Sequence, residues 1–113
     1  KSPEIMYSSW NNSEQFLNFY SFHKLKIAQI YSDKINNYEG NKILSVDYLI
    51  ISNGINLSVR DLQRYLEFKN LIIDSSNQLF KVNNWIKESE MLGINCHPVA
   101  LKGAFIYRID DNQ

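Results

Sequence analysis

The sequence predicts an α+β domain built as a winged helix-turn-helix, with one further helix and one strand at its C-terminal end. Apolar residues recur at helical spacings over residues 13–37 and again over 58–68. A Gly-containing turn at 53–54 separates two short predicted helices. Two short apolar runs, 71–73 and 79–82, flank a polar tetrad and predict a β-hairpin. Helix, turn, helix and hairpin follow one another in the order of a winged helix.

The first third of the chain is predicted to be mainly helical. Asn12 or Ser13 is a candidate N-cap, and apolar side chains then recur three, four and seven residues apart as far as Asn37. The chain would divide into two helices at 21–23. The apolar run 5–7 that precedes this region is predicted to form an edge strand or an arm.

The middle of the chain carries the predicted helix-turn-helix. Ser45 would cap a short helix ending at residue 52, and Gly54 supplies the left-handed residue after it. Ser58 and Asp61 approximate a capping box for a third helix over 58–68. Its apolar stripe is Val59, Leu62, Tyr65 and Leu66.

The remainder is predicted to form the wing and the two appended elements. Residues 71–73 and 79–82 would pair through a turn at 74–77. A further helix would begin at residue 83 or 84 and end at Gly93, and residues 104–109 would form a strand. The predicted core holds side chains from consecutive elements: Leu62, Leu66, Ile72, Phe80 and Trp85.

Composition limits the classes of function. The 113 residues include 12 basic and 12 acidic side chains, so the formal net charge is zero. This balance argues against a domain that holds nucleic acid mainly by charge. One cysteine excludes a disulfide framework and a multi-cysteine zinc site. The length fits one domain over 1–113, with a core at about 25–84 and terminal extensions that pack on it.

The sequence predicts neither catalysis nor a cofactor or metal. Cys96 and His97 are adjacent, and adjacent residues usually point in different directions, so they cannot pair as nucleophile and base. Glu88 and Glu90 are two residues apart on a predicted helix and diverge. No glycine-rich phosphate loop occurs among the four glycines. The chain is therefore predicted to be a binding protein.

The candidate binding residues lie on and just after the third predicted helix. They combine basic, amide and acidic side chains: Arg60, Gln63, Arg64, Glu67 and Lys69. Three interpretations stay open for them. They could form a solvated face with local ion pairs, dock a protein partner, or read DNA.

One stretch of the chain resembles a known class. Residues 57–82, LSVRDLQRYLEFKNLIIDSSNQLFKV, resemble the recognition helix and wing of the winged helices at the C-terminal ends of replication protein A middle subunits. They are also similar to their telomeric relatives in CST-type complexes. The resemblance implies a nuclear, non-catalytic module that docks proteins within a replication, repair or telomere assembly, without contact with a membrane. The alternative is duplex DNA binding through the helix 58–69, weak for the isolated domain.

Overall fold

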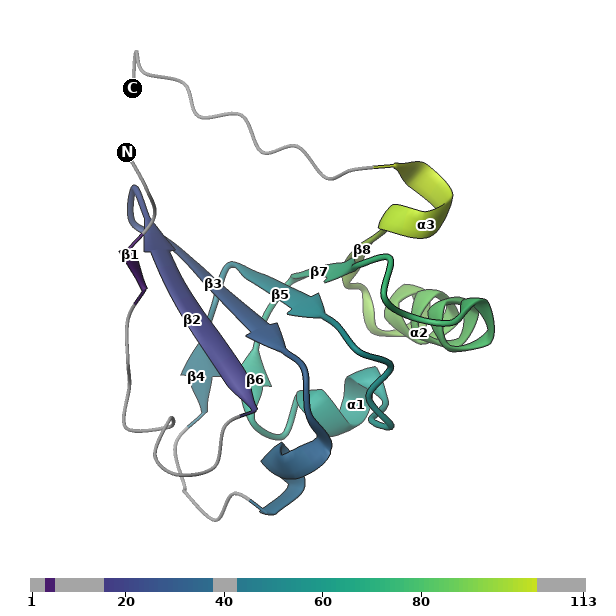
Figure 1. Ribbon diagram of the computed structural model, residues 1–113, viewed down its shortest axis with the longest axis horizontal. Coiled ribbons are helices and arrows are strands. Elements are labelled where there is room, and N and C mark those ends of the chain that lie inside the picture. Colours follow the sequence, from purple (N-terminus) through teal and green to yellow (C-terminus); the bar gives the residue numbers. More distant parts are fainter. Residues whose placement is uncertain (1–3, 6–15, 38–42, 104–113) are drawn as a thin grey trace.

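A computed structural model describes residues 4–5, 16–37 and 43–103 of the chain. A twisted six-stranded sheet dominates this part (Figure 1). Its strands, in spatial order, are β1 (Glu4–Ile5), β2 (Leu17–Phe22), β3 (Leu25–Ile30), β5 (Tyr48–Ile51), β7 (Asn70–Ile73) and β8 (Asn95–Pro98). β2 is antiparallel to both β1 and β3, and β3, β5, β7 and β8 run parallel.

The remaining elements lie in the connections between the parallel strands, except for α3, which follows β8. A second, two-stranded parallel sheet joins β4 (Leu44–Ser45) to β6 (Leu66–Glu67). The helical segments are η1 (Asp33–Asn37), α1 (Val59–Leu62), α2 (Leu79–Leu92) and α3 (Val99–Lys102). The predicted α+β class is thus confirmed, because a sheet and a few helices build this part of the molecule. The winged-helix architecture is not confirmed, because four segments of the chain fold differently from the prediction.

The helical prediction for residues 13–37 is wrong over residues 17–30, which the structure describes as strands. Residues 17–30 form the β2–β3 hairpin, which turns at His23 and Lys24 with φ of 50° and 65°. Aromatic and β-branched side chains fill this stretch, and they favour a pleated, half-buried surface. In β3, the buried residues Ala28 and Ile30 alternate with the half-buried residues Ile27 and Gln29, which is the period of a strand.

The short helix predicted before Gly54 is also wrong. Residues 48–51 form β5, which is hydrogen-bonded to parallel strands on both sides. A four-residue apolar run between polar residues suits a buried parallel strand as well as a helix. The turn itself is confirmed: Asn53 and Gly54 have φ of 63° and 59°.

The third predicted helix is confirmed only over its first turn. Ser58 and Asp61 form the capping box, but the helix ends at Leu62. The chain then pairs with β4, where the Val46 amide donates to the Glu67 carbonyl over 2.9 Å. Strand pairing with a distant segment therefore overrides the local helical spacing.

The predicted hairpin over 71–82 does not form. Residues 70–73 are β7, an inner strand of the sheet, and residues 79–82 are the first turn of α2. The helix buries Val82, Trp85 and Ser89, at spacings of three and four. It ends at Gly93 with φ of 72°, as predicted. The wing is thus replaced by a strand–helix–strand crossover, and the strand predicted at 104–109 lies outside the described residues.

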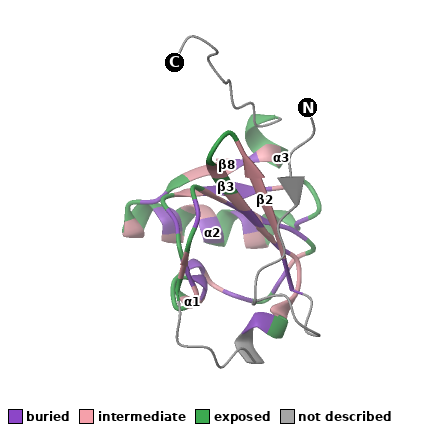
Figure 2. Ribbon diagram, turned by 90° about the vertical axis from the view of Figure 1, so that its left-hand side faces the viewer, coloured by how far each residue is buried: buried purple, intermediate pink, exposed green. Residues whose placement is uncertain are grey.

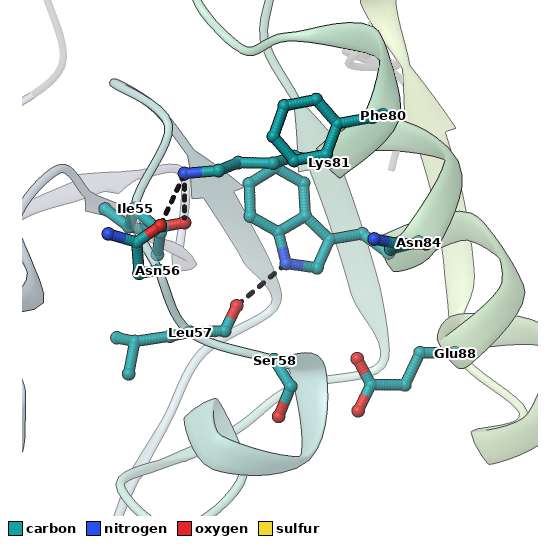
Figure 3. A pocket seen from close by; sticks show the side chains of 9 residues that line it. Ile55, Asn56, Leu57, Ser58, Phe80, Lys81, Asn84 and Glu88 are labelled. Carbon is teal, nitrogen blue, oxygen red and sulfur yellow. Dashed lines mark hydrogen bonds between the residues drawn. The ribbon is translucent and has the colours of Figure 1, made fainter.

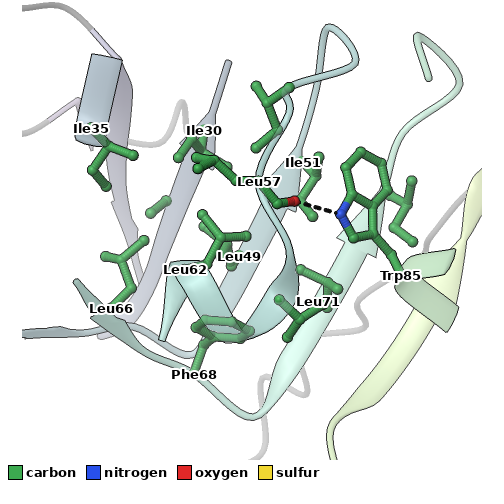
Figure 4. Packing of buried hydrophobic residues seen from close by; sticks show 14 of the residues in the cluster. Ile30, Ile35, Leu49, Ile51, Leu57, Leu62, Leu66, Phe68, Leu71 and Trp85 are labelled. Atoms are coloured by element: carbon green, nitrogen blue, oxygen red, sulfur yellow. Dashed lines mark hydrogen bonds between the residues drawn. The ribbon is translucent and has the colours of Figure 1, made fainter. Parts of the chain in front are cut away.

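The main core lies on one side of the sheet, which we call the core face. Side chains of the parallel strands pack there with α1, β6 and α2 (Figure 4). Leu62, Leu66 and Trp85 are buried in this cluster, as predicted. Ile72 is buried too, but it lies outside the cluster on the opposite side of β7. Phe80 is 60% exposed, so its predicted burial is wrong. Residues two apart on a helix face different sides, so Phe80 points away from the side that carries the buried Val82.

Candidate functional site at the carboxyl ends of the parallel strands

Two loops meet at one edge of the sheet. The loop 52–58 follows β5 and the loop 74–78 follows β7, and parallel strands end at the same edge. The Asn53 amide donates to Ser76 Oγ over 2.7 Å, and the Gly54 amide donates to Asn77 Oδ1 over 2.8 Å. In open sheets with parallel strands, ligands bind in crevices outside the carboxyl ends. This edge of the sheet is therefore the candidate site.

Lys81 on α2 holds the first loop in place. Its ammonium donates to the Gly54 carbonyl. It also donates to Asn56 Oδ1 over 2.6 Å and to the Ile55 carbonyl over 3.4 Å (Figure 3). Gly54 has φ of 59°, a left-handed conformation in which a side chain would be strained. The Lys81 charge is thus shared among loop oxygens, and the left-handed turn aims a carbonyl at it.

A groove of about 330 Å³ opens between this loop and α2 (Figure 3). Its lining comes from two segments: Ile55, Asn56, Leu57 and Ser58 of the loop, and Phe80, Lys81, Asn84, Trp85 and Glu88 of the helix. Trp85 is 3% exposed, and its indole N–H donates to the Leu57 carbonyl over 2.8 Å. Phe80 is exposed, and Asn84 is exposed as well. The groove therefore offers an accessible aromatic ring beside an amide.

Glu88 joins α2 to the start of α1. Its two carboxylate oxygens accept the amides of Val59, over 2.7 Å, and Arg60, over 3.0 Å. These amides belong to the first turn of a helix, where they have no partner within the helix. Both oxygens of Glu88 are thus engaged in holding the fold, and the groove wall at this end is rigidly placed.

Cys96 and His97 lie on opposite sides of β8, as strand geometry requires. Cys96 packs against the core, and burial raises the pKa of its thiol. His97 Nε2 lies 2.8 Å from the Gly103 carbonyl, on the other side of the strand. Across the described ranges, no three His, Cys, Asp or Glu side chains are grouped so that they could hold a metal ion.

The residues predicted from sequence to bind a partner do not share one helix face. Arg60 lies on α1, whereas Gln63 caps its C-terminal end and Arg64 follows beyond it. Arg64 Nη2 lies 3.9 Å from Asp61 Oδ1, in an exposed ion pair. Glu67 lies on β6, and Lys69 just before β7.

Part of this set nevertheless comes together away from the groove. Gln63 and Glu67 line a hollow of about 340 Å³ beside the two-stranded sheet. Glu67 and Lys69 line another of about 360 Å³, at the amino ends of β5 and β7. Sequence reasoning missed Phe80, Lys81 and Asn84, because it assigned residues 79–82 to a strand. The spacing of Lys81 and Trp85, four residues apart, was a signal for a helix that could have found them.

Comparison with known proteins decides the family. A family model described as the ComEC C-terminal domain matches residues 2–109, nearly the whole chain. The chain belongs to the ComEC C-terminal domain family. No curated protein and no solved structure matches this chain.

Membership of the ComEC family corrects several expectations. ComEC is a bacterial family of competence and DNA uptake, so the resemblance to replication protein A and CST winged helices is wrong. A role in a replication or telomere assembly, and a nuclear location, are wrong for the same reason. Duplex DNA reading through a helix over 58–69 also loses its basis, because that helix ends at Leu62.

The prediction that no membrane is involved is likewise unsupported, because ComEC is a membrane protein of DNA uptake. Within the described part of this chain, no helix has the length and apolar character needed to span a bilayer.

Proposed function

We propose that this chain serves bacterial DNA uptake as a non-catalytic binding domain, and that the groove between loop 55–58 and α2 contacts a DNA strand. The ComEC family match over residues 2–109 carries the assignment to DNA uptake. Residues 1–113 act as one domain in this proposal. The groove is favoured as the contact because it lies at the edge of the sheet where ligands usually bind.

The chemistry of the groove fits a nucleobase better than a phosphate. Phe80 presents an exposed ring, and aromatic side chains stack on bases of single strands without regard to sequence. Asn84 beside it can donate and accept hydrogen bonds. The charge of Lys81 is already shared among loop oxygens, so Lys81 releases few counterions from a phosphate backbone, and the acidic Glu88 releases none. Binding by the isolated domain is therefore weak and depends little on salt.

The absence of catalysis is part of the proposal. In some contexts the ComEC C-terminal domain is a metallo-β-lactamase-like region associated with nucleases. Such chemistry needs a set of metal ligands, and the residues that the structure describes offer no group of three. The proposed role of the chain therefore rests on binding.

A second contact, to a protein partner, is assigned to the surface around β6. Arg60, Gln63, Arg64, Glu67 and Lys69 remain the proposed residues. Gln63, Glu67 and Lys69 support it, because they line the two hollows beside the two-stranded sheet. Exposed Arg64 carries its charge at the same part of the chain.

Substitution of Phe80 tests the proposal in the full-length protein of a naturally competent bacterium. Phe80→Ala removes the stacking surface, which is worth about 1–3 kcal/mol per base, so affinity for a single DNA strand should fall about fivefold to 150-fold. Transformation frequency should fall with it. Phe80→Tyr keeps the ring and should retain both properties.

Met91→Ala is the matched control, because Met91 is also exposed on α2 but lies outside the groove lining. Equal protein levels are confirmed by immunoblot for each variant. Unchanged transformation and unchanged DNA affinity in Phe80→Ala would reject the groove as the contact.

A further inference from the structure

The side of the sheet opposite the core carries its own set of side chains, which we call the outer face. Between β2 and β8 it consists of Asn18, Tyr20, Phe22, Leu25, Ile27, Gln29, Tyr48, Ile50, Asn70, Ile72, Asn95 and His97. None of these belongs to the main core cluster or packs against it. Most are half-buried, and Figure 2 shows this intermediate burial along β2.

The strands beneath this face are of the kind that needs cover on both sides. Parallel sheets occur almost only with both faces packed, because the crossover connections place layers on them. Here the crossover elements α1, α2 and β6 contribute their buried residues to the core face. Four aliphatic side chains, Leu25, Ile27, Ile50 and Ile72, lie on the other side of the sheet. There α3 covers the edge formed by β7 and β8, where the Gly103 carbonyl contacts His97.

The polar groups of the outer face are prepared for burial. Gln29 Oε1 accepts hydrogen bonds from Asn18 Nδ2 and from the Tyr20 hydroxyl, each over 3.3 Å. Gln29 Nε2 donates to Ser52 Oγ over 2.9 Å. A buried polar group costs little when its hydrogen bonds are already made. A covering layer could therefore bury this amide cluster without breaking its hydrogen bonds.

A second pair of amides behaves in the same way at the other end. Asn95 Nδ2 donates to Asn70 Oδ1 over 3.1 Å, and Asn70 Nδ2 donates to the Asp47 carbonyl over 3.0 Å. The outer face holds no Lys, Arg, Asp or Glu side chain. Asp74, at its carboxyl edge, is bonded to Ser52 and to Ser76. The matching surface is thus uncharged and mainly apolar.

We propose that the outer face docks against an uncharged layer supplied by the part of the ComEC polypeptide that precedes this domain. The family is a C-terminal domain, so its members follow other polypeptide in the same chain. A covalently attached layer has an effective concentration of about millimolar, far above that of a second copy or a separate protein. Attachment in one chain therefore favours this occupant over a second copy or a separate protein, and crosslinks confined to residues 1–113 would contradict the proposal. The docking does not depend on the groove or on DNA.

Photo-crosslinking in the full-length protein tests this occupant. The photoreactive amino acid p-benzoylphenylalanine replaces Tyr48, a half-buried aromatic residue of the outer face. We expect crosslinks within one polypeptide, from position 48 to residues that precede this domain. The same amino acid at Met91, which is 79% exposed on α2, should give none to those residues. Tyr48→Phe controls for loss of the hydroxyl group, and the level of this variant should equal that of the unmodified protein on an immunoblot.

Three other results would also overturn the proposal. They are crosslinks only to a second copy of the protein, crosslinks only to a different protein, or a yield at position 48 no higher than at position 91. A separate variant, Ile50→Asp, places a charge on the same face and should abolish the crosslink from position 48, whereas Ile50→Val should retain it. The Phe80 variants leave the crosslink intact in either case, so failure of the DNA-binding proposal is distinguishable from failure of this one.

Discussion

Leu49 and Ile50 are neighbours on one strand, yet they belong to two different surfaces. Leu49 is fully buried on the core face, whereas Ile50 is half-buried on the outer face. The core face receives helices from the chain's own crossovers, and its partners are therefore fixed by the fold. The outer face also carries aliphatic side chains along its centre, and its amides are hydrogen-bonded to one another, to Ser52 and to the Asp47 carbonyl. One set of strands can therefore carry two packing surfaces. The described residues supply a complete packed layer for the core face only.

Truncation of the two neighbours should break the comparison most sharply. We expect Leu49→Ala to lower the free energy of unfolding of this chain by about 2–5 kcal/mol, because it leaves a cavity in a closed core. Ile50→Ala should cost less than about 1.5 kcal/mol, because its surroundings are already open to solvent. Urea denaturation followed by circular dichroism measures both. Equal losses would show that the two faces are equally closed.

Removal of Glu88 should be the next largest effect, and it tests how the core-face layer is held together. Glu88→Ala leaves two amides of α1 without their charged acceptor, which should cost about 1.5–3 kcal/mol. Glu88→Gln keeps one acceptor oxygen and should lose less. Amide hydrogen exchange at Val59 and Arg60 should quicken in the alanine variant. Unchanged exchange at both residues would contradict the capping role.

Loss of Gln29 should weaken the outer face by a smaller amount. Gln29→Ala removes hydrogen bonds to Asn18, Tyr20 and Ser52, each partly exposed to water. We expect a loss of about 0.5–1.5 kcal/mol in this chain. In the full-length protein the loss should be larger, because covered hydrogen bonds have no water to replace them. A smaller loss there than in this chain would argue against cover; thermal denaturation measures both forms.

Arg64→Ala should have the smallest effect. Its ion pair with Asp61 spans 3.9 Å between exposed side chains, and such pairs contribute little. The free energy of unfolding should change by less than about 0.5 kcal/mol. Arg60→Ala, which truncates an exposed arginine on α1, is the control. A loss above 1.5 kcal/mol, on the same urea assay, would mean that Arg64 has a structural contact beyond this pair.

Local features of the chain could be read correctly without the fold. The capping box of Ser58 and Asp61, the turn at Gly54 and the helix end at Gly93 depend on a few neighbouring residues. Backbone sterics and short-range hydrogen bonds decide them, so the sequence alone predicts them. Burial of Leu66 was also predicted, although from the wrong element, because a large aliphatic side chain is buried in either a helix or a strand.

The candidate groove could not be predicted in the same way. Its two walls, loop 55–58 and α2, are separated in the chain by α1, β6 and β7. Lys81 meets Gly54 only because two parallel strands end side by side. The prediction that residues 79–82 form a strand did not reveal this contact, because it buried Phe80 in the core and gave Lys81 no role.

The sequence by itself determined the α+β class, the capping box at Ser58 and the left-handed residues Gly54 and Gly93, because these follow from residue type and close spacing. Only the tertiary structure decided whether the short apolar runs at 17–30, 48–51 and 79–82 are helix or strand. A run of four to six apolar residues has the same pattern as a buried strand or as one turn of a helix, and the distant partner that it pairs with selects between them. For β5 and β7 that partner is each other, and the crossover through α1 places them side by side.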